Sequence, residues 1–207
     1  MKSAVAPPAE PAIWRGKLLV ATTNPNKLTE IRPLLASHEL VTLAELAAVP
    51  APDETGATFW ENARLKALAY AAATNLVTVA EDSGFEVEAL GGEPGVRSAR
   101  FVSPAATYEA RFAEIYRRLA GRASSARFVT ALAVARGREI LFETEAAIEG
   151  AVADTPRGEH GFGYDPIFWY PPLGCTTAEL TREQKALVSH RGRAFRDLKR
   201  FLVSRDR

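Results

Sequence analysis

The stretch "RFVTALAVARGREILFETEAAIEG" at residues 127–150 decides the fold class. Its two halves, 127–136 and 138–150, are rich in apolar residues and flank Gly137, which predicts two long strands paired as a hairpin. Around this hairpin, short strands are predicted at 17–22, 40–43 and 76–80, an aromatic loop and strand at 161–172, and helices at 25–36, 58–74, 107–121, 178–189 and 193–204. This order of elements predicts an α/β domain with a mixed sheet and two lobes.

The composition indicates a globular protein with one substantial core. The chain has 207 residues, 47% of them hydrophobic, which is enough for one two-lobed domain but not for two large domains. Its 26 basic and 25 acidic residues give a formal charge of +1, so charge gives no reason to expect a nucleic-acid or membrane partner. The single cysteine, Cys175, excludes an internal disulfide and fits a reducing, cytoplasmic environment.

An Ala/Pro-rich segment, "MKSAVAPPAEPAIWRG", opens the chain. Residues 1–16 are predicted to form a flexible extension, and residues 17–204 a single two-lobed domain. No stretch approaches the length of a membrane span.

The segment "TTNPNK" at 22–27 joins the first predicted strand directly to the first helix. Backbone N–H groups and the helix dipole at such a turn attract phosphate, and Lys27 adds a positive charge. Asn24 as N-cap and Pro25 at the first helical position also explain the turn on structural grounds alone. The segment is therefore compatible with a phosphate site and with a simple capped helix start.

Acidic residues follow the strand predicted at 76–80. Glu81 and Asp82 are expected where this strand leaves the core, beside a turn at Ser83 and Gly84. Carboxylates there are costly to bury unless a cation or a hydrogen-bond donor meets them. The segment therefore predicts either a metal or catalytic site or a surface hairpin.

The second predicted helix begins with a T-x-x-E capping box at Thr58. Asp53 and Glu54 precede it, while Asn62 and Lys66 lie one turn apart on one helix face. A solvated helix surface is the default interpretation of that face.

Aromatic and basic residues gather in the last third of the chain, in "GFGYDPIF" and "REQKALVSHRG". The residues concerned are Phe162, Tyr164, Asp165, Lys185, His190 and Arg191. They could serve a stacked base with a phosphate tail, or form a core aromatic cluster beside a basic surface helix. Taken with the predicted phosphate turn and a carboxylate cluster suited to Mg²⁺, they indicate a nucleoside triphosphate site.

Six ordered blocks support a family resemblance: "TTNPNK", "ETGATFWENARLKA", "EDSGFEVEALGGEPGVRSAR", "GFGYDPIF", "AELTREQK" and "SHRG". In these blocks, from Lys17 to about Leu202, the sequence resembles the inosine/xanthosine triphosphate pyrophosphatase family. It departs from the family pattern at Thr23 and Asn26, where glycine is common, and at Glu81, which replaces an aspartate. The resemblance implies an elongated mixed sheet flanked by helices, with a nucleotide cleft between two lobes.

The resemblance also implies an activity: hydrolysis of dITP, ITP or XTP to the monophosphate and pyrophosphate, with Mg²⁺, by a cytoplasmic homodimer. Asp82 is the expected base and metal ligand, with Asp53 or Glu54 as the second metal ligand. Arg97 and Arg100 are assigned to internal salt bridges. Phosphate contacts are expected from residues 22–27, Ser83 and Lys185, and base contacts from residues 162–165, His190 and Arg191. The substrate-binding set is thus Thr22, Thr23, Asn24, Pro25, Asn26, Lys27, Ser83, Phe162, Gly163, Tyr164, Asp165, Lys185, His190 and Arg191.

Two alternatives stay open at the level of sequence. One is a related pyrophosphatase that prefers modified pyrimidine or standard nucleotides, and the other is a nucleotide sensor without turnover. A cysteine hydrolase built on Cys175 and His190 is disfavoured, because Cys175 lies in a Pro/Gly loop without an activating context.

Overall fold

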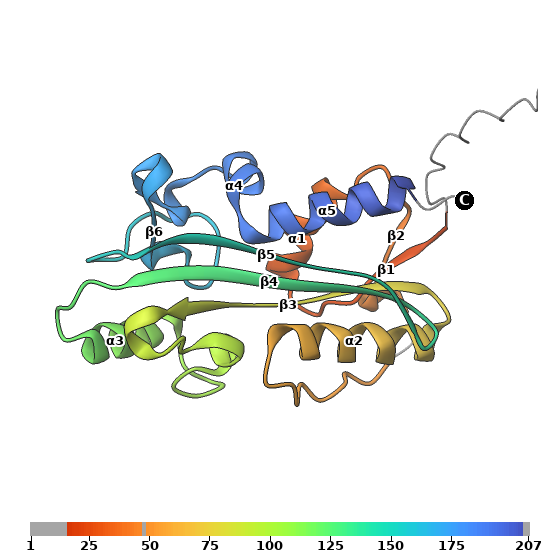
Figure 1. The fold of residues 1–207 in the computed structure, drawn as a ribbon, viewed down its shortest axis with the longest axis horizontal. Helices are drawn as coiled ribbons and strands as arrows, with labels where there is room; N and C mark the ends of the chain where they lie inside the picture. Colours follow the sequence, from red (N-terminus) through yellow and green to blue (C-terminus); the bar gives the residue numbers. More distant parts are fainter. Residues whose placement is uncertain (1–15, 47–48, 205–207) are drawn as a thin grey trace, which may run out of the picture.

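The computed structural model describes residues 16–46 and 49–204. The extension predicted over residues 1–16 therefore lies outside the described residues, apart from Gly16. Within the described ranges, strands form one seven-stranded sheet in the order β2-β1-β3-β4-β5-β6-β7 (Figure 1). Their bounds are β1 Leu18–Val20, β2 Leu40–Thr42, β3 Val77–Val87, β4 Ser125–Arg136, β5 Glu139–Val152, β6 Phe168–Tyr170 and β7 Cys175–Thr176.

The sheet is mixed, as predicted. β1 pairs in parallel with β2 and β3, whereas β3, β4 and β5 are antiparallel to one another. β4 and β5 form the predicted hairpin across Gly137, whose φ of 55° lies in the left-handed region that glycine adopts without strain. These long strands give the molecule its elongated shape (Figure 1).

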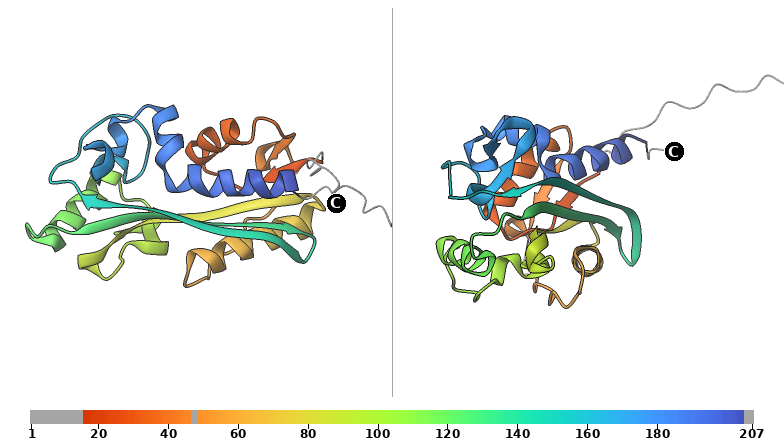
Figure 2. Two further views of the ribbon diagram at one scale, coloured as in Figure 1. Left: turned by 45° about the horizontal axis from the view of Figure 1, so that its top comes forward. Right: turned by 60° about the vertical axis from the view of Figure 1, so that its left-hand side comes forward.

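Helices cover both faces of the sheet. α2 and α3 lie on one side, and α1, α4 and α5 lie on the other (Figure 1, Figure 2). The bounds are α1 Pro25–Leu34, α2 Phe59–Thr74, α3 Tyr108–Leu119, α4 Arg182–Val188 and α5 His190–Ser204. Short 3₁₀ turns span Leu43–Glu45, Glu88–Leu90, Gly95–Arg100, Asp165–Ile167, Pro171–Leu173 and Thr177–Glu179. Every α-helix in the described ranges is too short or too polar to cross a lipid bilayer.

Three apolar clusters pack these layers together. One lies under α2 and contains Phe59 and Ala131, and a second lies under α1 and α5 and contains Ile31 and Phe195. The third contains Phe85 with residues of α3 and β6, at the other end of the long strands. The sequence patterns at 58–74 and 107–121 are confirmed, because Thr58 and Thr107 cap α2 and α3 as predicted.

β3 is longer than its apolar run predicts. The predicted strand ends at Ala80, but each residue from Thr78 to Val87 has a partner on β4, so Glu81 and Asp82 lie in the middle of the strand. The expected turn at Ser83 and Gly84 is therefore wrong. Gly84 instead permits close packing, since a Cβ there would lie 2.5 Å from the Gly95 carbonyl oxygen.

The C-terminal helices are divided differently from the sequence pattern. α4 begins only at Arg182, because Thr181 caps it by accepting a hydrogen bond from the Gln184 backbone N–H. Ser189 has extended backbone angles and separates the two helices, so α5 already begins at His190. The last three residues of the "SHRG" block thus begin α5, and Gly192 packs against α4 too closely for any side chain.

Candidate active site

A cavity of about 300 Å³ opens beside β3, where the cluster under α2 meets the cluster around Phe85. It brings together most of the residues singled out by sequence. Those that line it are Thr22, Thr23, Asn24, Lys27, Glu54, Asp82, Ser83, Phe162, Gly163, Tyr164, Asp165, Lys185, His190 and Arg191. Three described residues of the predicted site, Pro25, Asn26 and Asp53, are exposed and are not part of this lining. Of the two alternative metal ligands, only Glu54 therefore faces the cavity.

The turn between β1 and α1 forms one wall. Its Asn24 side chain accepts hydrogen bonds from the backbone N–H groups of Asn26 (2.9 Å) and Lys27 (3.3 Å), so the capped helix start is confirmed. The Thr22 hydroxyl in turn accepts from the Asn24 N–H at 3.1 Å. Because the cap already uses the Asn26 and Lys27 N–H groups, the Lys27 ammonium and the threonine hydroxyls are donors that remain for an anion.

We call Glu54, Asn62, Lys66 and Asp82 the acidic end of the cavity. Lys66 Nζ lies 2.8 Å from Glu54 Oε1 and 3.1 Å from Asp82 Oδ1, so one ammonium bridges two carboxylates. Burial alone would lower the pKa of Lys66, but these two carboxylates outweigh it and raise that pKa. Lys66 is therefore a permanent cation beside Asp82.

Asn62 completes the acidic end. Its Nδ2 donates to Asp82 Oδ2 at 3.0 Å, and its Oδ1 accepts from the Gly56 backbone N–H at 2.8 Å. The Asn62 side chain is fully buried. The predicted solvated face of α2 is therefore wrong, because Asn62 and Lys66 point inward at Asp82.

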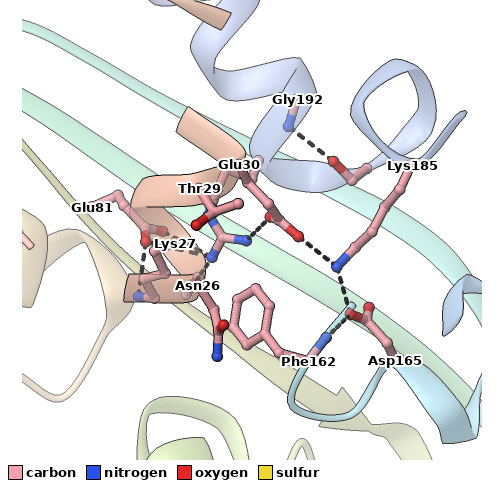
Figure 3. Close-up of polar contacts among 12 residues, drawn as sticks. Asn26, Lys27, Thr29, Glu30, Glu81, Phe162, Asp165, Lys185 and Gly192 are labelled. Atoms are coloured by element: carbon pink, nitrogen blue, oxygen red, sulfur yellow. Dashed lines mark hydrogen bonds and ion pairs between the residues drawn. The ribbon is translucent and has the colours of Figure 1, made fainter. Parts of the chain in front are cut away.

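We call Glu30, Glu81, Asp165, Lys185 and Arg191 the ion-pair end. Figure 3 labels the first four of them. Glu30 on α1 accepts from both cations, with 2.7 Å to Lys185 Nζ and 2.7 Å to Arg191 Nη1. Lys185 also bonds Asp165 at 2.5 Å, and the Asp165 carboxylate accepts the Phe162 N–H at 2.7 Å. The groups thus form a continuous chain of alternating charges.

Glu81 links this network of charges to the turn between β1 and α1. Its carboxylate lies 2.8 Å from Lys27 Nζ and 3.4 Å from Arg191 Nη2, which also donates to Ser83 Oγ at 2.9 Å. Burial raises the pKa of Glu81, but Arg191 and Lys27 outweigh burial and hold it well below its usual range. Glu81 is therefore ionised and bound by two cations.

Aromatic rings form the floor of the cavity. Tyr164 stacks on Phe85 with 5.0 Å between ring centroids and donates its hydroxyl to the Ser98 carbonyl at 2.9 Å. His190 stacks on Phe128 at 4.8 Å. Burial, together with Arg191 and Lys185, lowers the pKa of His190 well below its ordinary value, so this imidazole is neutral. Its buried Nδ1 has no hydrogen-bond partner in the described residues.

The acidic end fits a divalent cation that arrives with phosphate. In the described ranges, no three Asp, Glu, His or Cys side chains cluster closely enough to hold a metal by themselves. Mg²⁺ is usually bound by only one or two carboxylates, with substrate phosphates and water as its other ligands. Glu54 and Asp82 converge on a single cation position, now taken by Lys66, which matches such a donor set.

A profile of the Ham1 family matches residues 18–201. This chain belongs to the Ham1 family. It is 45% identical over 190 residues to an Exiguobacterium protein named dITP/XTP pyrophosphatase, covering 90% of this chain and 97% of that one. A Thermus thermophilus protein of the same name is 47% identical over 186 residues, covering 88% and 89%. The solved Ham1 protein from Coxiella burnetii superposes with a TM-score of 0.83 at 36% identity, covering 90% and 98%. The resemblance drawn from the sequence blocks is thus confirmed.

Three side chains at or beside the cavity were missed as site residues by sequence reasoning: Glu30, Asn62 and Lys66. The spacing of Asn62 and Lys66 within "ENARLKA" was a usable signal, because it places both on one helix face. Glu30 carries no comparable signal, since it resembles any glutamate on a helix. Arg97 and Arg100 do form the predicted ion pairs, at 3.6 Å each, to Glu93 and Glu54, but these pairs lie at the surface, so the expectation that they are internal is wrong.

Proposed function

We propose that this chain hydrolyses dITP, ITP and XTP to the monophosphate and pyrophosphate, and so removes non-standard purine nucleotides from the nucleotide pool. The observation that carries the proposal is that one cavity joins a carboxylate end, a capped turn with Lys27, and an aromatic end with buried cations. These are the parts that a nucleoside triphosphate with a purine base requires. The names of relatives at 45% and 47% identity support the same reaction.

Asp82 is the proposed general base. Its carboxylate accepts the proton of the attacking water, while Asn62 and Lys66 hold its two oxygens. Asp82 and Glu54 would hold Mg²⁺, which when bound neutralises phosphate charge and orients the triphosphate. Lys27, Thr22, Thr23 and Ser83 are proposed to contact the phosphates.

The ion-pair end is proposed to bind the base. Phe162 offers its ring, with Lys185 Nζ at 5.0 Å and the Arg191 guanidinium at 5.5 Å from the ring centroid. This supports a place for Lys185 beside the base rather than beside the phosphates. Arg191 can only donate hydrogen bonds, and its buried Nε has no partner in the described residues. A donor there favours the 6-oxo group of hypoxanthine and xanthine over the 6-amino group of adenine.

Pyrophosphate release measured with ITP, XTP, ATP and GTP, with Mg²⁺ and with a chelator, tests the proposal. We expect monophosphate and pyrophosphate from ITP and XTP, much slower reaction with ATP, and loss of activity with the chelator. Release of diphosphate and orthophosphate would contradict attack at the α-phosphorus. Tight ITP binding without products would instead support a nucleotide sensor. The homodimer and the cytoplasmic location implied by the family resemblance stay predictions.

A further inference from the structure

The side chain of Asn62 connects two segments that carry carboxylates. Asp82 lies in the middle of β3, and Gly56 lies two residues after Glu54 in the loop before α2. The Asn62 amide spans them, donating to Asp82 at 3.0 Å and accepting from the Gly56 N–H at 2.8 Å. Because a backbone N–H can only donate, the oxygen of Asn62 must face Gly56 and its NH₂ must face Asp82.

The position of Asn62 is set by the start of α2. The capping box of Thr58 and Glu61 fixes the first turn, and the Asn62 N–H donates to the Thr58 carbonyl at 3.2 Å. Lys66 follows one turn later on the same face and contacts the other oxygen of Asp82. One helix therefore holds both oxygens of the carboxylate, one through a charged donor and one through a neutral donor.

Loop and helix also fit tightly at this point. A Cβ on Gly56 would lie 2.6 Å from Asn62 Oδ1, so the loop backbone can approach the amide only because residue 56 is glycine. The buried amide has partners at both ends, as a group that is 0% exposed requires. The contact therefore has a defined geometry rather than a range of side-chain orientations.

We propose that Asn62 is a positioning residue, which fixes the rotation of the Asp82 carboxylate and ties it to the loop that carries Glu54. This inference rests on the proposed function, in which Asp82 is the base. Asn62, a neutral donor, orients the carboxylate of Asp82 without neutralising its charge. Lys66 is charged and could not orient the carboxylate in this way by itself. Loss of this bond lets the carboxylate turn away from the attacking water, and a displacement of about 1 Å can cost about 10²-fold in rate.

Asn62→Leu tests the role in turnover, because leucine has a similar size but makes no hydrogen bonds. We expect kcat for ITP to fall by roughly tenfold to 10²-fold, with KM changed less than about threefold, since the nucleotide contacts stay in place. The matched control is Thr78→Val, which removes a buried hydrogen bond (3.1 Å to the Leu76 carbonyl) from the same strand but away from the cavity. It should lower Tm slightly and leave kcat unchanged.

A double-mutant cycle separates positioning from a general structural effect. If Asn62 acts through Asp82, Asn62→Leu should not lower the residual kcat of Asp82→Ala any further. A further fall by the same factor as in the wild-type background would overturn the proposal. So would Asn62→Leu enzyme that keeps kcat within about twofold of wild type.

A spectroscopic measurement is independent of activity and of the folding of Asn62→Leu. The chain has four asparagines, at 24, 26, 62 and 75, and one glutamine, Gln184, so the side-chain amide signals in a ¹⁵N-correlated NMR spectrum are few and assignable. In the wild type, we expect one Asn62 side-chain amide proton to resonate downfield of the other side-chain amide protons. This resonance should move upfield in Asp82→Ala and keep its wild-type position in Thr78→Val. An unshifted signal in Asp82→Ala would sink the inference. Absence of pyrophosphate release by wild-type protein would instead count against the proposed function alone.

Discussion

The two ends of the cavity hold their charges in different ways. At the acidic end, the side chains of Glu54 and Lys66 are 35% and 12% exposed. At the ion-pair end, those of Arg191 and Glu81 are both 2% exposed, and each charge meets an opposite charge. The acidic end is thus open to water through Glu54, while Lys66 and Asp82 are largely buried; at the ion-pair end the charges are buried and already compensated.

This difference separates chemistry from stability. Removing one partner of a buried ion pair leaves an unpaired charge and typically costs about 3–5 kcal/mol of folding free energy. Partly exposed pairs contribute only about 0–1 kcal/mol, because water screens them. A substitution of the partly exposed Glu54 should therefore affect turnover more than folding, whereas substitutions at the ion-pair end should affect both.

The largest expected effect is on turnover at the acidic end. Asp82→Asn should lower kcat by about 10²- to 10⁴-fold or more, because it removes the proposed base and the proposed metal contact. Nucleotide binding should change little, and Tm should fall by less than in the variant Asp165→Asn, since Lys66 keeps its contact with Glu54, whose side chain is 35% exposed. Steady-state pyrophosphate release and thermal unfolding check both parts. A variant with near-normal kcat would place the base elsewhere, with Glu81 or Glu54 as the next candidates.

The next effect is on stability at the ion-pair end. Asp165→Asn leaves Lys185 with one fewer charge partner in a buried site, and should lower the free energy of unfolding by about 3 kcal/mol. For a chain of this length, that corresponds to a fall in Tm of roughly 6–12 °C. Asp154→Asn is the matched control, because Asp154 is exposed and should change stability by less than about 0.5 kcal/mol. Equal Tm values for the two variants would show that the buried charges of the ion-pair end do not stabilise the fold more than a surface charge does.

The sequence predicted the parts of the fold that depend on local signals. The β4–β5 hairpin follows from two apolar runs around Gly137, and the starts of α2 and α3 follow from Thr58 and Thr107. The length of β3 could not be predicted, because residues 81–87 stay extended only through pairing with β4, far along the chain. The start of α5 at His190 depends on its close packing against α4, which no local pattern encodes.

The candidate site likewise contains residues that local sequence identifies and contacts that it does not. Residues in family blocks, such as Asp82 and Arg191, could be placed from sequence because the blocks name them. Which partners they meet could not, since Glu30 and Arg191 are 161 residues apart. The inward orientation of Asn62 follows from which face of α2 packs on the sheet, and helix spacing alone leaves that face open.

A substitution at the ion-pair end should reduce the selectivity for ITP over ATP. Arg191→Ala is expected to lower kcat/KM for ITP more than for ATP, so that the ratio of the two values narrows by on the order of tenfold. The reason is that the substitution removes a hydrogen-bond donor to the 6-oxo group. Lys27→Ala should weaken both substrates about equally. Arg191→Ala should also be less stable, but the ratio is unaffected by this, since both substrates meet the same folded fraction. An equal loss for ITP and ATP would assign Arg191 to the phosphates.

The smallest effect is expected at the rim of the acidic end. Arg100 Nη1 lies 3.6 Å from Glu54 Oε2, and its side chain is 40% exposed. A pair of this kind contributes about 0–1 kcal/mol, so Arg100→Gln should shift Tm by less than about 4 °C and change kcat/KM for ITP by less than about fivefold. Glu54 keeps its bond to Lys66, which holds its carboxylate in place. A loss of kcat/KM well beyond tenfold with unchanged Tm would mean that Arg100 contacts the triphosphate directly, and that the acidic end extends past Glu54 to the surface.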